Sequence, residues 1–280
     1  MKLPVWLRAV RAVRSTTSLA AFFAYLLLVM GPLQRVIVFP LVWLLPARRT
    51  RMLGAWIRAQ ARVTRAIVRY GAGVRIHVSG PPIRESCIVV MNHQSVLDVM
   101  IALCEVEGPT ALIPVRTRYQ WGMPGISPFL RVARYPFITQ RRSAIRGDLA
   151  AIEDGAARVA SGEATIILYP EGHRTRTGDI GPFMPGGLST ALAKARKPVY
   201  CVVGDGMWQV RTIADGLVGL AGVDVTVRIS GPVAPPEREE EIPQFIASLR
   251  DRMVASLADL RAELRIDRKA PVNGSGARAD

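Results

Sequence analysis

Acidic residues are missing from the first 84 positions of this 280-residue chain. Those positions hold 14 of the 37 Lys and Arg residues, so 23 basic residues remain against 22 acidic ones. A nucleic-acid enzyme needs basic residues around its site of chemistry, whereas here they flank the most apolar stretch of the sequence. The net charge of +15 therefore indicates anionic lipid headgroups and not nucleic acid as the partner. Arginine-rich composition is the competing explanation, but it does not account for the missing acids.

Cysteine is scarce and several catalytic motifs are absent. Cys87, Cys104 and Cys201 lie far apart with no CxxC, which excludes a disulfide framework and a zinc site and favours buried reduced thiols in a cytosol-facing body. The sequence contains neither G-x-S-x-G nor H-E-x-x-H, so it offers no serine nucleophile elbow and no zinc-hydrolase helix. We expect no metal and no cofactor.

The N-terminal segment, residues 1–50, is the most apolar part of the chain and is predicted to anchor it in a membrane. Residues 16–33 are uncharged, Gly31 and Pro32 interrupt them, and a second apolar run follows at 36–45. Basic residues flank the segment on both sides: Arg8, Arg11, Arg14, Arg48, Arg49 and Arg51. Positive charge at both ends favours a helical hairpin that dips into one leaflet over a single kinked spanning helix. No small-residue cleavage site follows, which argues against a signal peptide.

A basic amphipathic helix is predicted next. Its arginines are spaced by 7, 4, 3 and 4 residues and form one stripe: Arg51, Arg58, Arg62, Arg65 and Arg69. Such a helix suits a membrane interface. An ordinary amphipathic helix with a solvated arginine face is the alternative.

From residue 74 onward, short apolar runs alternate with helical periods. Six runs read as strands: 74–78, 87–91, 111–115, 165–169, 199–203 and 223–229. Helices are predicted from 145 to 159 and from 245 to 264 by apolar spacings of three and four residues. This alternation predicts an α/β fold with a mostly parallel sheet and helices on both faces. We therefore expect one domain over residues 51–266, including the basic helix, and a disordered tail over 267–280.

The first candidate site is Asn92-His93-Gln94-Ser95-Val96-Leu97-Asp98, which begins where a predicted strand ends. Residues five apart do not share a helix face, so His93 must lie in the turn and Asp98 in the first helical turn. The carboxylate can then hold one imidazole nitrogen and leave the other as a base for a hydroxyl. A histidine that only caps the helix is the alternative.

Two further candidates also follow predicted strands. Tyr169-Pro170-Glu171-Gly172-His173-Arg174-Thr175 offers a guanidinium for phosphate and a carboxylate that can accept hydrogen bonds from hydroxyls. Phe137-Ile138-Thr139-Gln140-Arg141-Arg142 ends in two arginines that suit a second phosphate contact. A solvated surface turn is the alternative in both cases, and the Gly-rich loop 181–187 is equally a ligand contact or a tight turn.

Taken in order, NHQSVLD, RYPFITQRR, YPEGHRT and KPVYCVV resemble the four blocks of the glycerolphosphate acyltransferase superfamily, most closely the bacterial 1-acyl-sn-glycerol-3-phosphate acyltransferases. The resemblance covers about residues 50–230, and the order and spacing of the blocks make it more specific than any one of them. The resemblance implies the following roles: general base for His93, its partner for Asp98, phosphate ligand for Arg141, and acceptor contact for Glu171, Gly172 and Arg174.

The resemblance also implies the reaction. A fatty acyl group would pass from acyl-CoA or acyl carrier protein, as co-substrate, to the sn-2 hydroxyl of a lysophosphatidic acid at the cytoplasmic face of the bacterial inner membrane. His93 would take the hydroxyl proton without a covalent intermediate, and amides near the following helix start would stabilise the oxyanion.

Three departures from the family pattern bear on the acceptor. Gln140 stands where Asp is common, His173 replaces Thr, and Arg134-Tyr135-Pro136 replaces the usual Gly of the second block. A lyso-ornithine lipid or a lysophospholipid with a larger headgroup is therefore the alternative acceptor. A lipid or thioester hydrolase and a non-enzymatic membrane adaptor are the alternatives from other functional classes.

Overall fold

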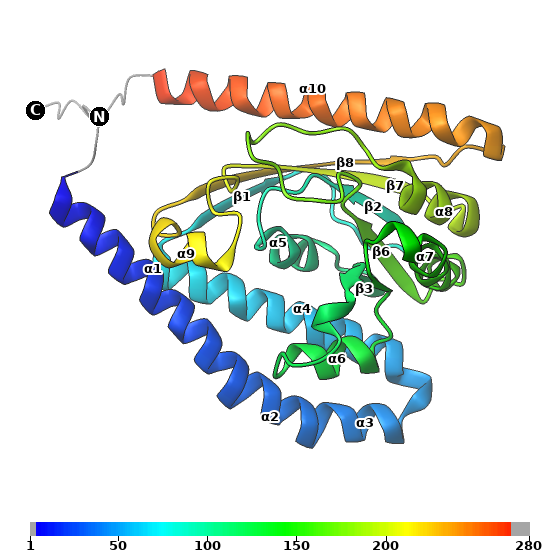
Figure 1. Cartoon of the computed structure of the whole chain (residues 1–280), viewed down its shortest axis with the longest axis horizontal. Coiled ribbons are helices and arrows are strands. Elements are labelled where there is room, and N and C mark those ends of the chain that lie inside the picture. Colours follow the sequence, from blue (N-terminus) through cyan, green and yellow to red (C-terminus); the bar gives the residue numbers. More distant parts are fainter. Residues whose placement is uncertain (1–3, 270–280) are drawn as a thin grey trace, which may run out of the picture.

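A six-stranded sheet of order β1-β8-β7-β2-β6-β3 forms the centre of the computed structural model, which describes residues 4–269 (Figure 1). Its strands are β1 (Arg75–Ser79), β2 (Ile88–Met91), β3 (Thr110–Leu112), β6 (Ala164–Leu168), β7 (Val199–Asp205) and β8 (Asp224–Val233). Neighbouring strands are parallel except β7 and β8, which are antiparallel. The predicted mostly parallel sheet is confirmed.

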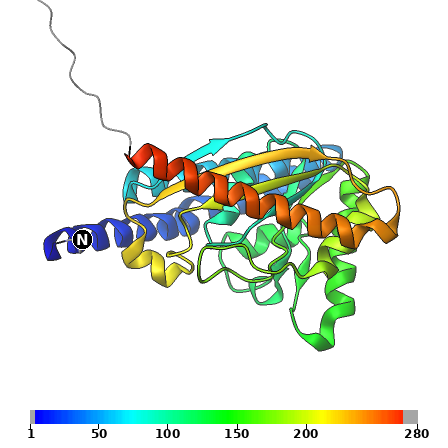
Figure 2. The ribbon, with the colours of Figure 1, turned by 90° about the horizontal axis from the view of Figure 1, so that it is seen from above.

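The central strands are apolar along their whole length because helices cover both faces of the sheet. Every residue of β2 and β6 is buried, as expected for strands with no solvent-facing side. The long helix α10 (Ile242–Lys269) runs along one face, while α4 (Arg49–Ile67) and α5 (Asp98–Glu105) lie on the other (Figure 1). Seen from above, α10 crosses the sheet obliquely (Figure 2).

The remaining elements lie around the central sheet. They are α6 (Ile126–Val132), α7 (Ile145–Ala160), α8 (Pro185–Ala195), α9 (Ile213–Gly219), a two-stranded sheet of β4 (Val115–Arg116) and β5 (Phe137–Ile138), and short 3-10 turns at Thr117–Tyr119, Arg142–Ala144 and Glu239–Glu241. The predicted amphipathic helix from 145 to 159 is confirmed, and Ile152, Ala156 and Val159 are its buried apolar residues.

The N-terminal segment is one continuous helix, Val5–Leu44, and not a hairpin within residues 1–50. It comprises α1 (Val5–Tyr25), α2 (Gly31–Leu33) and α3 (Phe39–Leu44), joined by π-helical stretches at Leu26–Met30 and Gln34–Val38. Pro32 and Pro40 each follow such a stretch, at the start of α2 and α3. A π-turn removes the contact between a proline ring and the preceding turn, so the helix bends without ending.

The chain does reverse, but at residues 45–48. A 3-10 turn at Pro46–Arg48 leads into α4, which continues as a π-helical stretch, Val68–Ala72, and runs back beside α1. Ser18 donates to the carbonyl of Ile67, and the Tyr25 hydroxyl hydrogen-bonds the Gln60 side chain. The hairpin is therefore made by the apolar helix and the basic helix together.

Part of the predicted basic surface is engaged by the body itself. Arg11 Nε donates to the carbonyl oxygen of Ala221 at 2.9 Å. Arg65 forms an ion pair with Glu105 at 3.0 Å. Three arginines of the predicted stripe are exposed: Arg51, Arg62 and Arg69. The two faces of α4 thus differ, since one docks on the body and the other is exposed.

The C-terminal helix α10 extends to Lys269, past the predicted boundary at residue 266. Its described buried apolar residues are Ile242, Ile246, Leu249, Met253, Leu257 and Leu260, and their spacings of three and four residues agree with the predicted helical period. The rest of the predicted disordered tail, residues 270–280, lies outside the described residues.

Candidate active site

His93 and Asp98 meet at the carboxyl end of β2. His93 lies in the turn after the strand, Asp98 is the first residue of α5, and His93 Nδ1 is 3.0 Å from Asp98 Oδ2. This is the geometry that the five-residue spacing predicts. The two side chains are 18% and 5% exposed, so the carboxylate is buried while the ring still reaches the surface of a cavity.

The backbone amides of the turn are all engaged within the protein. Gln94 N and Ser95 N donate to Asp98 Oδ2 at 2.6 and 2.7 Å, and His93 N donates to Glu171 Oε1 at 2.8 Å. The N–H of Val96 donates to the carbonyl of Arg211, and the N–H of Leu97 donates to the Ser95 hydroxyl. The N–H of Asp98 donates to the carbonyl of Ser95. The turn uses the amides of residues 93–98 to hold itself, and oxyanion stabilisation by amides near the start of α5 stays a prediction.

Glu171 supports the same turn from the end of β6. Its Oε1 accepts the N–H of His93, and its Oε2 accepts the N–H of Gly181 at 2.9 Å. The residue is 2% exposed, and burial raises the pKa of its carboxyl although the two N–H donors act in the opposite direction. The observed contacts of Glu171 are therefore to the protein's own backbone, and its contact with an acceptor stays a prediction.

Tyr169 fixes the plane of the imidazole. The His93 and Tyr169 rings stack with centroids 4.3 Å apart and planes 28° apart.

Gly172, in the same loop, has a φ of +69°, and a Cβ there would lie 2.7 Å from the Met184 sulfur. Glycine is needed at this position because only it adopts such a backbone without strain beside that neighbour.

The two predicted phosphate ligands lie in different hollows. Arg174 lines the same large cavity as His93, and its Nη1 donates to the carbonyl of Arg211. Arg141 instead lines a smaller hollow of about 360 Å³ together with Arg116 and Arg118. Because Arg116 and Arg118 line both hollows, the two spaces adjoin.

The large cavity has a volume of about 1360 Å³ and is mainly apolar. Apolar residues of the N-terminal helical pair, Val5–Leu44 and α4 with its π-helical extension, line it: Leu19, Phe22, Phe23, Leu26, Met30, Ile57, Ala61 and Val68. Its polar lining includes His93, Glu171, His173, Arg174 and Arg211. A large, mainly apolar cavity with a histidine base in its wall can hold an aliphatic chain with its reactive group beside the base.

Sequence reasoning assigned no role to two polar residues behind the turn, Gln94 and Asp205. The Gln94 side chain is 1% exposed and donates to Asp205, at the end of β7, with an Nε2 to Oδ1 distance of 3.0 Å. Burial opposes ionisation of Asp205, but hydrogen bonds from Arg261 and Gln94 hold its pKa below the ordinary value. An acidic residue two positions after the predicted strand 199–203 was the available sign for Asp205.

The family model and the curated proteins that match this chain all carry acyltransferase names. The sequence model of the acyltransferase family matches residues 75–204, from β1 to β7. Human 1-acyl-sn-glycerol-3-phosphate acyltransferase beta is 30% identical over 138 residues, which are 48% of this chain and 48% of that protein. The human alpha form is 28% identical over 140 residues, 49% of this chain and 47% of that protein. The chain thus spans about half the length of the curated relatives it matches.

A solved structure extends the likeness beyond the matched domain. The crystal structure of the 1-acyl-sn-glycerophosphate acyltransferase PlsC from Thermotoga maritima superposes with a TM-score of 0.65 at 21% identity, covering 90% of this chain and 98% of that one. The shared fold therefore includes elements on both sides of residues 75–204. With the four blocks in order and the His93–Asp98 pair formed at the end of β2, the family resemblance is confirmed: residues 75–204 are an acyltransferase-family domain.

Proposed function

We propose that the protein transfers a fatty acyl group from acyl-CoA or acyl carrier protein to the sn-2 hydroxyl of 1-acylglycerol-3-phosphate, giving phosphatidic acid. The observation that carries the proposal is the 3.0 Å contact between His93 Nδ1 and Asp98 Oδ2 in the wall of a mainly apolar cavity. The names of the curated relatives support the choice of acceptor. The proposed reaction needs neither a metal nor a cofactor.

In the proposed mechanism Asp98 accepts the Nδ1–H of His93, which leaves Nε2 with a lone pair for the acceptor hydroxyl. The hydroxyl oxygen bonds to the thioester carbonyl carbon as Nε2 takes its proton. The tetrahedral intermediate then expels the thiolate by breaking the C–S bond, and the imidazolium returns the proton to sulfur. Thioesters are activated, so one base and correct positioning can suffice.

Incubation of the purified chain with labelled acyl-CoA and a panel of lysolipids tests the function directly. We expect labelled phosphatidic acid from lysophosphatidic acid and slower transfer to lysolipids with larger headgroups or to lyso-ornithine lipid. Replacing acyl-CoA by acyl carrier protein in the same assay identifies the donor. Thiol release that does not depend on lysolipid would contradict transfer and indicate a hydrolase.

Replacing Arg174 with alanine should raise the KM for lysophosphatidic acid about 10- to 100-fold and change kcat little, because a guanidinium bond to phosphate contributes about 1.5–3 kcal/mol. Steady-state kinetics with varied acceptor measure both constants. Arg141→Ala in parallel shows whether the smaller hollow holds the same phosphate. Arg146→Ala is the charge control, since Arg146 is exposed on α7 outside both hollows. An unchanged KM for Arg174→Ala would count against its phosphate role.

We also propose that the N-terminal helical pair binds an anionic membrane at the cytoplasmic face of the bacterial inner membrane. Val5–Leu44 is long and apolar enough to cross a bilayer, and it exposes Leu28, Val36, Trp43 and Leu44. These side chains and the free arginines of α4 suit lipid tails and headgroups. Co-sedimentation should be stronger with phosphatidylglycerol vesicles than with phosphatidylcholine vesicles, and protein left in the supernatant with both would contradict the proposal.

A further inference from the structure

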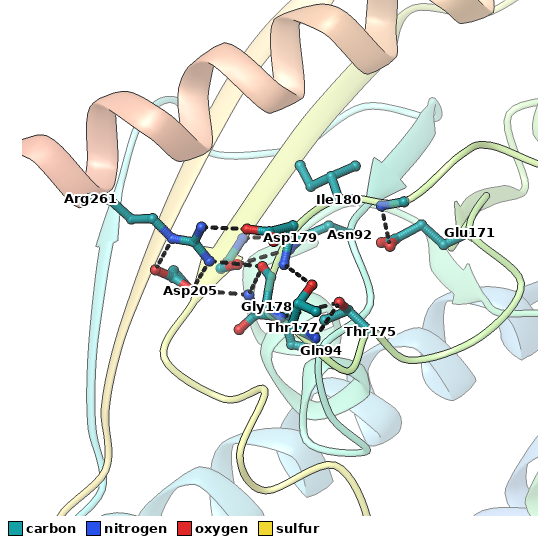
Figure 3. Close-up of polar contacts among 12 residues, drawn as sticks. Asn92, Gln94, Glu171, Thr175, Thr177, Gly178, Asp179, Ile180, Asp205 and Arg261 are labelled. Atoms are coloured by element: carbon teal, nitrogen blue, oxygen red, sulfur yellow. Dashed lines mark hydrogen bonds and ion pairs between the residues drawn. The ribbon is translucent and has the colours of Figure 1, made fainter.

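Two arginines on one face of α10 hold the segment that follows the YPEGHRT block. Arg250 and Arg261 are 11 residues apart, and at about 100° per residue they point in nearly the same direction. Arg250 Nε donates to the carbonyl of Gly181 at 3.0 Å. Arg261 Nη2 donates to the carbonyl of Gly178 at 2.9 Å, and its Nη1 pairs with Asp179 at 2.7 Å (Figure 3).

Arg261 also reaches the end of β7. Its Nε is 2.9 Å from Asp205 Oδ2, and the other oxygen of Asp205 accepts the Gln94 amide at 3.0 Å. The same Gln94 nitrogen donates to Gly178 O at 3.0 Å, and its oxygen accepts the N–H of Met207 at 3.1 Å. Figure 3 shows the Arg261 guanidinium and the Gln94 amide converging on Asp205 and Gly178. The Gln94 side chain is thus fixed by groups that Arg261 itself orders.

Two chains of hydrogen bonds lead from these contacts to His93. In the first, the backbone N–H of Gln94 donates to Asp98 Oδ2 at 2.6 Å, and Asp98 contacts the His93 imidazole. In the second, the backbone N–H of Gly181 donates to Glu171 Oε2, and Glu171 Oε1 accepts the backbone N–H of His93. A shift of Gln94 or of the segment at 178–181 would therefore move the catalytic turn.

We propose that Arg261 is a positioning residue for the reaction, acting on His93 through Asp205 and Gln94. The inference rests on the proposed function and extends it to α10, which lies outside the matched domain. The Asp205 carboxylate is 12% exposed. Without Arg261 it would keep a buried charge and lose its cationic partner, so it would rearrange or draw in water. Gln94 would then lose one of its two fixed acceptors.

Arg261→Ala should lower kcat at least about tenfold and leave the KM values for donor and acceptor within about twofold, since misplacing a base affects chemistry more than binding. Hydrogen exchange of the full chain in detergent should be faster in the peptide covering 92–98, where two amides depend on Asp98. Arg261→Lys should recover only part of kcat, because an ammonium cannot span Asp205 and Gly178 as a guanidinium does.

Arg228→Ala is the matched control. It removes another arginine–carboxylate pair to α10, Arg228 with Glu263 at 2.5 Å, which has no contact with the turn. The control should leave kcat and exchange over 92–98 at the wild-type level. An equal loss of kcat in both variants, or an unchanged kcat in Arg261→Ala, would overturn the positioning role.

Exchange separates this inference from the proposed function. If the wild-type chain transfers no acyl group, the function fails, whereas faster exchange over 92–98 in Arg261→Ala alone still supports the positioning role. Unchanged exchange in a folded Arg261→Ala overturns it whatever the activity. If Arg261→Ala does not fold, Arg261→Lys takes its place with the same two measurements, and wild-type values in both would be decisive against it.

Discussion

Replacing His93 with alanine should abolish acyl transfer and leave the fold almost unchanged. The proposed base would be lost, and with it a factor of at least about 10³ in kcat. Asp98 would still accept the amides of Gln94 and Ser95, so the turn keeps its main hydrogen bonds. We expect a stability loss of about 1 kcal/mol. Labelled phosphatidic acid formation and thermal unfolding in detergent measure the two effects.

His77→Ala is the matched control for this substitution. His77 lies on β1, is exposed, and belongs to the same matched domain, so its loss should leave transfer intact. Normal turnover by His93→Ala would exclude the general-base mechanism. A biological role that persists while transfer is lost would instead favour a lipid-binding adaptor over an enzyme.

The positions of His93 and Glu171 could be predicted because both follow strands that can be recognised from the local sequence. Buried parallel strands are continuous apolar runs, so β2 and β6 were visible in the sequence, and polar residues at their carboxyl ends fall at one edge of the sheet. The short fixed spacing of His93 and Asp98 then allowed only one arrangement. The roles of these residues in acyl transfer stay predictions.

The N-terminal hairpin shows where local rules failed. Gly31 and Pro32 normally end a helix, and charge at both ends suggested that the chain turns back between them. The helix instead continues, because π-turns accommodate Pro32 and Pro40 and Gln34 is anchored by its contacts. The Gln34 side chain donates to the Gly125 carbonyl at 2.8 Å and accepts from Trp56 at 3.0 Å. These partners lie far away in the sequence, so no local pattern could predict the bend.

The contacts of Arg261 were beyond prediction for a related reason. The apolar period of the last helix fixes which side packs on the sheet, but it does not say what its arginines meet. Arg261 and Asp205 are 56 residues apart, and Gln94 and Asp205 are 111 apart. Side-chain pairing across such distances has no periodicity in the sequence, and it becomes apparent only when β7, α10 and the turn after β2 are assembled.

Asp98→Asn should lower kcat by about 10²–10⁴ while the turn stays folded. An amide oxygen in place of Oδ2 can accept the same three donors, from His93, Gln94 and Ser95. What it cannot supply is the negative charge that stabilises the imidazolium as the hydroxyl proton is taken. The loss should therefore fall on kcat, with acceptor KM nearly constant, in steady-state kinetics.

A double variant separates this electrostatic role from a purely structural one. Residues that act as a unit are not additive, so His93→Ala combined with Asp98→Asn should be no slower than His93→Ala alone. Asp215→Asn is the control, because Asp215 accepts the Thr212 amide at 2.8 Å at the start of α9 with no histidine partner, and it should keep the wild-type kcat. If Asp98→Asn matched that control, Asp98 would only hold the turn, and His93 would act without a charged partner.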